Sequence, residues 1–329
     1  MTAIRPDRIA VRAWGGAPRP RLHRRTLLAS ALALSAVRRA QAAGVLRMGF
    51  QKGEPILIAL KAAKTLETQL APLGIDVTWT EFQFGPPMLE AMRAGSIDVG
   101  GVGDTPPIFS QAAHGNLVYI AGQTAGGQAV LLPAGSTIQT LAELKGKRIA
   151  FGRGSSAHSL LLKVLEKAGL TYDQIQPVYL GPADAGAAFE HGAIDAWSIW
   201  DPYYALFETR PGVRTLITDA QVGGQNAFFL ARAGFAHDNP SVTAKVVDAF
   251  IATGAWARAH RSEVADQLAA STGISREAIG RAVDRAPFQV RFMDQAFVDS
   301  QQKVADRFRA LNLIPADIQV ASAVWHPTA

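Results

Sequence analysis

Four short stretches of the chain place polar side chains where an apolar strand is followed by a helical pattern. They read GFQKGEP (49–55), GVGDTPP (101–107), FGRGSSAHS (151–159) and IWDPYY (199–204). The first turn of a helix has free backbone N–H groups and the positive end of the helix dipole, so it favours a negatively charged group. The chemistry that these residues could perform is therefore the binding of a small anion.

The second stretch shows this pattern most fully. Asp104 and Thr105 are residue types that cap a helix, and Pro106 is favoured at the first helical position. Glycines at 100, 101 and 103 leave room for a ligand to approach the backbone. Asp104, like Asp201 in the fourth stretch, is expected to be a helix cap first and a ligand contact second.

Other kinds of site have weaker support. Residues 152–157 (GRGSSA) fit a loose dinucleotide-binding fingerprint with Asp173 at a suitable distance, but alone this is a weak signal. The sequence contains no G-x-S-x-G or Walker A motif, and its seven histidines include no H-E-x-x-H. Because cysteine is also absent, we expect no metal site, no cofactor and no disulfide.

An exported enzyme that acts on a small anion is the alternative from a different class. It is motivated by His158, which stands beside Ser155 and Ser156. The sequence places no general base at a suitable spacing from those serines, so we expect a binding protein and not an enzyme.

The elements that must position these stretches alternate between strands and helices, which indicates an α/β fold. In the first half we expect strands at 45–50, 77–82 and 97–102 and helices at 55–70 and 87–94. In the second half we expect strands at 148–151, 177–180 and 194–199 and helices at 156–168 and 185–191. Ligands bind beyond the carboxyl ends of the strands in such sheets, where all four stretches fall.

The two halves repeat one plan. At a constant offset of 97 residues, five positions of the first half match the second: Ala91, Gly95, Ile97, Asp98 and Asp104 with Ala188, Gly192, Ile194, Asp195 and Asp201. We therefore predict two similar lobes facing a shared cleft, formed by residues 43–131 and 132–229. Helices at 241–257 and after Asp294 should complete the first lobe with residues 230–329. The chain would then cross twice, near 130–133 and 228–232, as a two-strand hinge.

The first 42 residues have the features of an export signal. A basic segment with Arg24 and Arg25 precedes an apolar run at 27–37, and Ala40-Gln41-Ala42 offers small residues for cleavage. The run has 11 residues, whereas a membrane span needs about 20. The paired arginines resemble a twin-arginine signal, so we expect a periplasmic protein without stable membrane insertion.

Removal of this segment reverses the net charge. The chain has 33 basic and 27 acidic residues, of which nine arginines and one aspartate lie in residues 1–42. The remainder keeps 24 basic and 26 acidic residues, a net charge of −2. No cluster of Lys and Arg survives, which argues against a nucleic-acid partner.

Several of these motifs together resemble the periplasmic aliphatic sulfonate-binding proteins of ABC importers, a group related to taurine- and nitrate-binding proteins. The resemblance is carried by GFQKG, FGPPMLEAMRAGSIDVGGVGDTPPIFSQAAHG, GRGSSAHSLLLKVLEKAGL and PADAGAAFEHGAIDAWSIWDPY, and it spans nearly all of residues 45–320. It implies a type II periplasmic-binding-protein fold, a monomer, and delivery of a captured sulfonate to the permease of an ABC transporter. Taurine, nitrate or another small anion is the alternative ligand.

The resemblance also implies a set of ligand-binding residues. Carried over position by position, the cleft of the family falls on Gln51, Gly103, Asp104, Thr105, Ser155, Ser156, His158, Trp200 and Asp201. A sulfonate has three acceptor oxygens, which helix N-terminal amides and the Thr105 and Ser155 hydroxyls could meet. An alkyl tail would rest on Trp200 or Phe84.

The chain departs from the family pattern at three positions. Ser156 stands where Asn is frequent, Gly186 where Arg is frequent, and Gln128 where Glu is frequent. These departures bear on the organic tail of the ligand more than on its sulfonate group.

Overall fold

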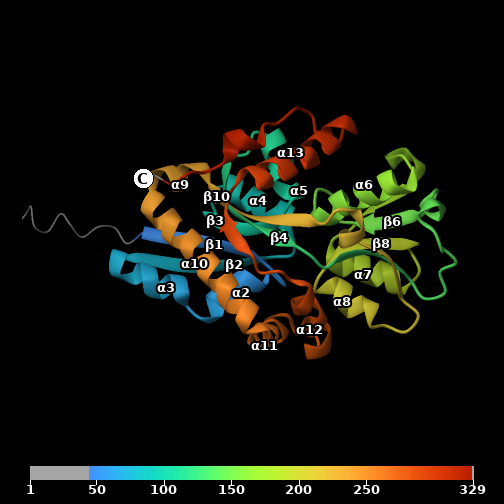
Figure 1. Ribbon diagram of the computed structural model, residues 1–329, viewed down its shortest axis with the longest axis horizontal. Coiled ribbons are helices and arrows are strands. Elements are labelled where there is room, and N and C mark those ends of the chain that lie inside the picture. Colours follow the sequence, from blue (N-terminus) through green and yellow to red (C-terminus); the bar gives the residue numbers. More distant parts are fainter. Residues whose placement is uncertain (1–43, 328–329) are drawn as a thin grey trace, which may run out of the picture. The chain divides into compact units, whose positions relative to one another are not determined.

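A computed structural model describes residues 44–327, which hold two β-sheets and the helices packed against them (Figure 1). The predicted export signal at 1–42 lies outside the described residues. Within the described part, no helix is both long and apolar enough to cross a bilayer.

The first sheet has six strands in the order β11-β4-β10-β3-β1-β2. Strands β1, β2 and β3 run parallel, while β10 runs antiparallel to both β3 and β4. The strands are β1 (Gly44–Gln51), β2 (Ile75–Phe82), β3 (Val99–Gly103), β4 (Leu117–Ala125), β10 (Gln225–Arg232) and β11 (Val290–Phe292). We call this sheet and its helices lobe 1.

Lobe 2 is built on a five-stranded sheet in the order β7-β6-β8-β5-β9. Its strands are β5 (Gln128–Leu132), β6 (Arg148–Phe151), β7 (Gln176–Tyr179), β8 (Ala196–Trp200) and β9 (Arg214–Thr218). Its helices are α6 (Ser156–Ala168), α7 (Pro182–Glu190) and α8 (Tyr203–Glu208). The predicted α/β class with two sheets is therefore confirmed.

Helix α6 shows how the sequence sets the local structure. Its buried face includes Leu161, Val164 and Leu165, which recur at helical spacing and join the core of lobe 2. It ends where Gly169 adopts a φ of 68°, a conformation that a residue with a side chain rarely tolerates. The predicted limits of this helix, 156–168, match the structure.

The helices of lobe 1 come from both ends of the described chain. The early ones are α2 (Pro55–Ala62), α3 (Thr65–Leu70), α4 (Gly85–Arg93) and α5 (Thr105–Ala112). The late ones are α9 (Ala233–Asp238), α10 (Pro240–Ala259), α11 (Arg261–Thr272), α12 (Arg276–Arg285) and α13 (Gln295–Ala310). Helix α10 lies beside α2 (Figure 1), and its Phe250 stacks on Phe229 of β10 with ring centroids 4.4 Å apart.

The chain crosses between the sheets earlier than expected. It leaves β4 of lobe 1 at Ala125 and enters β5 of lobe 2 at Gln128, so the first crossing is Gly126-Gly127. The second crossing covers 219–224, between β9 and β10. Residues 130–132 of the first predicted site and all of 228–232 lie inside β5 and β10, because these apolar segments are parts of strands that each belong to one sheet. The lobe boundaries as folding units, and the hinge, remain proposals.

Two further expectations differ from the structure. The helix expected over 55–70 is interrupted at Lys64, which adopts a φ of 51° between α2 and α3. Strands β4, β9, β10 and β11 and helices α9, α11 and α12 were not predicted. The Asp294 cap is confirmed, since its Oδ1 accepts the Phe297 N–H at 2.9 Å.

The duplicated plan is visible as a matching ion pair in each lobe. Asp98 accepts hydrogen bonds from Arg47 Nε at 2.7 Å and Nη2 at 2.9 Å. Asp195 accepts them from Arg148 Nε at 3.2 Å and Nη2 at 2.9 Å. In both lobes the backbone N–H of the Asp also donates to the carbonyl of the Arg at 2.8 Å. The pair thus fixes the turn before one strand to the start of its neighbour.

The two pairs differ in burial, which predicts unequal stability effects. Asp98 is fully buried and also accepts a bond from Arg232 at 2.9 Å, whereas the Asp195 side chain is 32% exposed. Replacing Asp98 by Ala should lower the free energy of unfolding by about 3 kcal/mol, because it leaves the guanidinium groups of Arg47 and Arg232 without their carboxylate partner. Asp195→Ala should lower it by about 1 kcal/mol. Urea unfolding of both variants checks this, and equal losses would contradict it.

A buried aromatic cluster surrounds His158 where α5 and α13 of lobe 1 meet lobe 2. The imidazole stacks on Phe151 at 4.7 Å and meets the edge of Phe308 at 4.9 Å between centroids. Burial, and to a lesser degree the charge of Arg153, lowers the pKa of His158 to about 3. The imidazole is therefore neutral in the folded protein at neutral and mildly acidic pH.

Burial of neutral His158 predicts a pH-dependent loss of stability. The unfolded chain binds a proton at this residue below about pH 6.5 and the folded chain does not, so stability falls as pH drops below that value. Between pH 7 and pH 5 the contribution of His158 alone should be a loss of about 2 kcal/mol. Urea unfolding of His158→Gln at both pH values should show a smaller loss. The same change at His237, whose side chain is 88% exposed, is the control; equal pH dependence in the wild type and His158→Gln would contradict the account.

Candidate functional site

A cavity of about 130 Å³ lies between the two lobes at the carboxyl ends of β1, β3 and β8. Lobe 1 contributes residues 51–56 and 123–126, and lobe 2 contributes Gln128, Ser156 and residues 200–202. The lobes touch beside it: a side chain at Gly53 would collide with Pro202, and a Cβ at Gly103 would lie 2.7 Å from the Cβ of Ser156. The predicted cleft is therefore present as a pocket between the two lobes.

Each of the four predicted junctions is a strand followed by a helix. Helices α2, α5, α6 and α8 begin within a few residues of the ends of β1, β3, β6 and β8. The start of α2 and the first residue of α6, Ser156, belong to the pocket lining. The side chains that line the pocket are thus set by the turns that start these helices.

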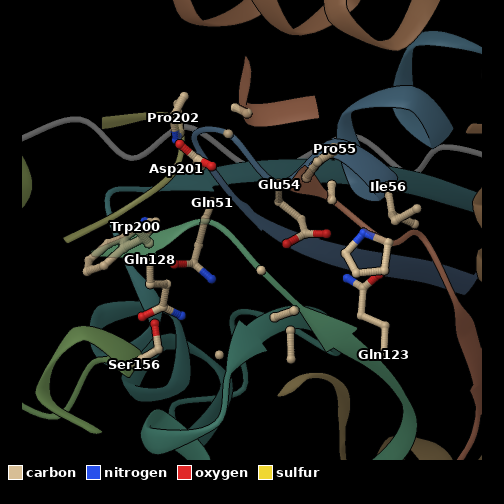
Figure 2. Close-up of a pocket in the computed structure, with 18 of the residues that line it drawn as sticks. Gln51, Glu54, Pro55, Ile56, Gln123, Gln128, Ser156, Trp200, Asp201 and Pro202 are labelled. Carbon is tan, nitrogen blue, oxygen red and sulfur yellow. The ribbon is translucent and has the colours of Figure 1, made fainter. Parts of the chain in front are cut away.

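Five of the nine predicted site residues line the pocket. They are Gln51, Gly103, Ser156, Trp200 and Asp201. In Figure 2 the side chains of Gln51, Gln128, Ser156 and Trp200 gather at one side of the cavity. Strand pairing places Gln128 directly opposite Trp200.

The other four predicted residues lie behind the lining. Asp104, Thr105, Ser155 and His158 are all buried and none faces the cavity. The Thr105 hydroxyl donates to Asp104 Oδ1 at 2.8 Å, and the Ser155 hydroxyl donates to the Gly152 carbonyl at 2.7 Å. These two hydroxyls are committed to local bonds, so ligand contacts by the four residues stay predictions.

Two uncharged amides, those of Gln51 and Gln128, contribute to the polar lining of the pocket. Gln51 Nε2 donates to the Gly101 carbonyl at 2.9 Å, which fixes the Gln51 side chain against β3. Gln128 is 4% exposed, and its Oε1 is buried without a hydrogen-bond partner. This oxygen is an acceptor, so only a hydrogen-bond donor, such as a water molecule or a donor group of a ligand, can complete it. Gln128 was singled out from the sequence as a departure from the family but was not expected to line the site.

Asp201 lines the pocket but its carboxylate is held by other groups. Arg285 of α12 donates to it from Nε and Nη2, each at 2.9 Å, and the Ala205 N–H donates at 3.0 Å. Arg285 also donates to Glu208 at 2.9 Å. Because α12 belongs to lobe 1 and Asp201 to lobe 2, this bidentate pair joins the lobes at the edge of the pocket.

Gly127, at the first crossing, makes room for that pair. Its φ is 80°, and a Cβ there would collide with Asp201 Oδ2. The Gly127 carbonyl accepts the Asp201 N–H at 2.8 Å. Glycine is required at this position because the φ is positive and because a Cβ would collide with Asp201.

Glu54 is a lining residue that sequence reasoning missed. It precedes Pro55 at the start of α2, and its Oε1 is buried without a hydrogen-bond partner. Burial raises the pKa of Glu54 to about 7, although the Ile56 N–H and the Gln123 side chain favour the ionised form. The available signal was its place in GFQKGEP, from which only Gln51 was predicted as a site residue.

Two aromatic rings lie against the glycine-rich loop of lobe 2. A Cβ on Gly152 would lie 3.4 Å from Phe84, and one on Gly154 would lie 3.5 Å from Phe109. These two rings come from lobe 1 and cover the loop. Phe84 therefore packs on this loop and does not line the cavity, where it was expected to meet a tail. Among residues 44–327 no group of three His, Asp or Glu side chains could hold a metal ion.

Comparison with known proteins places these features in a family. The sequence profile of the NMT1-like family matches residues 42–273. The chain is 38% identical in sequence to the periplasmic aliphatic sulphonate binding protein SsuA from Escherichia coli. Its structure matches the crystal structure of that protein with a TM-score of 0.78 over 86% of this chain and 92% of that one.

Two further relatives agree with this assignment. The alkanesulfonate-binding protein SsuA from Xanthomonas axonopodis pv. citri, solved bound to MOPS, is 38% identical with a TM-score of 0.82 over 87% of this chain and 99% of that one. The taurine-binding periplasmic protein of Escherichia coli strain K12 is 31% identical over 67% of each chain. The chain therefore belongs to the NMT1-like family and, within it, to the aliphatic sulfonate-binding proteins.

Proposed function

We propose that this protein captures aliphatic sulfonates in the pocket between its lobes and delivers them to an ABC-type importer from the periplasm. The observation that carries the proposal is the 38% identity over nearly the full length of two solved sulfonate-binding proteins, one of them with a bound sulfonate, MOPS. The permease subunits as partners and the monomeric state are part of the proposal.

The pocket suits a permanent monoanion with an apolar tail. The amides of Gln51 and Gln128 and the Ser156 hydroxyl can donate to sulfonate oxygens without a full countercharge, as in other anion sites built from neutral donors. The Trp200 ring beside them offers an apolar face to the tail. Because lining residues come from both lobes, only the closed arrangement lets a ligand meet all of them.

The alternative of an exported enzyme finds no support at His158. Its low pKa makes it a poor base at neutral pH. Its Nε2 is buried without a hydrogen-bond partner, its Nδ1 faces the Gly154 N–H, and the Ser155 hydroxyl donates to a carbonyl instead. The similar proteins of known structure named above are binding proteins as well.

Isothermal titration calorimetry tests the proposed ligand class. Ethanesulfonate and MOPS should bind with dissociation constants in the micromolar range, about −8 kcal/mol, while nitrate and sulfate give little heat. Nitrate and sulfate lack an organic tail and cannot use the Trp200 face. Binding of nitrate with no response to either sulfonate would contradict the proposal.

The ion pair between lobes predicts a coupling to ligand affinity. Replacing Arg285 by Gln removes the bidentate contact with Asp201, so the closed arrangement should be less populated and sulfonate affinity should fall about tenfold, or about 1.4 kcal/mol. The loss should appear as faster dissociation in stopped-flow measurements. Arg281→Gln on the same helix, where the side chain is 51% exposed, is the matched control and should not change affinity. Unchanged affinity in Arg285→Gln, with an intact fold by circular dichroism, would show that the pair does not hold the lobes closed.

A further inference from the structure

The pocket contains two carboxylates, and only one of them is matched by a cation. Asp201 is paired with Arg285, as described above. Glu54 makes no ion pair among residues 44–327, and its Oε1 is buried without a hydrogen-bond partner. Lys52, two residues earlier on the same turn, also lines the pocket, but among residues 44–327 no salt bridge joins its ammonium group to Glu54.

An unmatched carboxylate in this place is costly for the protein alone. Burial penalises the ionised form, which accounts for the raised pKa of Glu54. It is also costly for a simple alkanesulfonate, because a second negative charge in a pocket of about 130 Å³ repels the first. A ligand that brings a positive charge to Glu54 removes both penalties.

The position of Glu54 separates it from the groups that suit the sulfonate. In Figure 2 its carboxylate points towards Gln123, on the other side of Gln51 from Gln128, Ser156 and Trp200. Gln123 is 8% exposed, and its side chain is placed to hydrogen-bond to the Glu54 carboxylate. The pocket thus has a neutral polar end provided by both lobes and an acidic end provided by lobe 1.

We infer that Glu54 selects sulfonates whose tail carries a protonated amine, with the sulfonate near Gln51, Gln128 and Ser156 and the ammonium group at Glu54 and Gln123. The ligand class is that of short aminoalkanesulfonates. The inference rests on the proposed function, since it assumes that the anion of the ligand is a sulfonate bound in this pocket.

Two ligands of the same size isolate the charge of the tail. Taurine, which is 2-aminoethanesulfonate, and propane-1-sulfonate differ only in a terminal ammonium group against a terminal methyl group. Calorimetric titration of the wild-type protein should give at least tenfold tighter binding of taurine. The Glu54→Gln variant keeps the size of the side chain. Its affinity for taurine should be at least tenfold lower than that of the wild type, and its affinity for propane-1-sulfonate should be higher.

The control variant removes a nearby charge outside the pocket. Glu81→Gln lies at the end of β2, next to β1, where the side chain is exposed and does not line the cavity. It should leave the ratio of the two affinities unchanged. If Glu54→Gln does not fold, as judged by circular dichroism, the inference is judged by the ratio of the taurine and propane-1-sulfonate affinities of the wild-type protein alone.

The outcomes separate this inference from the proposed function. Binding of both ligands with no preference for taurine in the wild type, or with a ratio unaffected by Glu54→Gln, overturns the inference and leaves sulfonate capture standing. Failure of the wild type to bind taurine, propane-1-sulfonate, ethanesulfonate and MOPS overturns the proposed function, and this inference with it.

Discussion

The pocket exists because strand ends from two separate sheets meet at one place, so that neither lobe can enclose a ligand by itself. Lobe 1 contributes the turn after β1 and the end of β3, and lobe 2 contributes the end of β8 and the first residue of α6. A ligand bound there is contacted by both lobes, and its binding energy favours their contact. Capture and closure are therefore one event in this account.

A matching ion pair joins neighbouring strands within each lobe. The Arg47–Asp98 and Arg148–Asp195 pairs tie corresponding strands in the two lobes at the amino ends of β3 and β8. The Asp201–Arg285 pair then joins the lobes at the pocket edge, where Gly127 leaves space for it. Asp201 serves this contact and the cap of α8, and Asp104 is buried behind the lining. Asp104 and Asp201, which match each other in the two halves, therefore support the structure around the pocket.

Much of the fold could be predicted from local patterns, and the site only in part. Helix α6 and strand β6 were placed correctly because their apolar spacing and glycine stops are local signals. Strands β4 and β10 were missed because their pairing joins segments about a hundred residues apart in sequence, which no local pattern records. Gln51, Ser156 and Trp200, which line the pocket, could be singled out because they lie at a strand end or at the start of the next helix, whereas Glu54 looked like an ordinary residue before a helix. Only the folded chain shows that its Oε1 is buried without a partner.

A crystal structure of the protein grown with propane-1-sulfonate tests the central claim most directly. The account predicts the sulfonate group between the lobes, with its oxygens in hydrogen-bonding distance of Gln128 and Ser156 and its tail against Trp200. The groove beside Lys163, Lys303 and Arg307 is the competing location, since it lies between α6 of lobe 2 and α13 of lobe 1 and carries positive charge. A sulfonate found there, with the pocket between the strand ends left to water, would contradict the account.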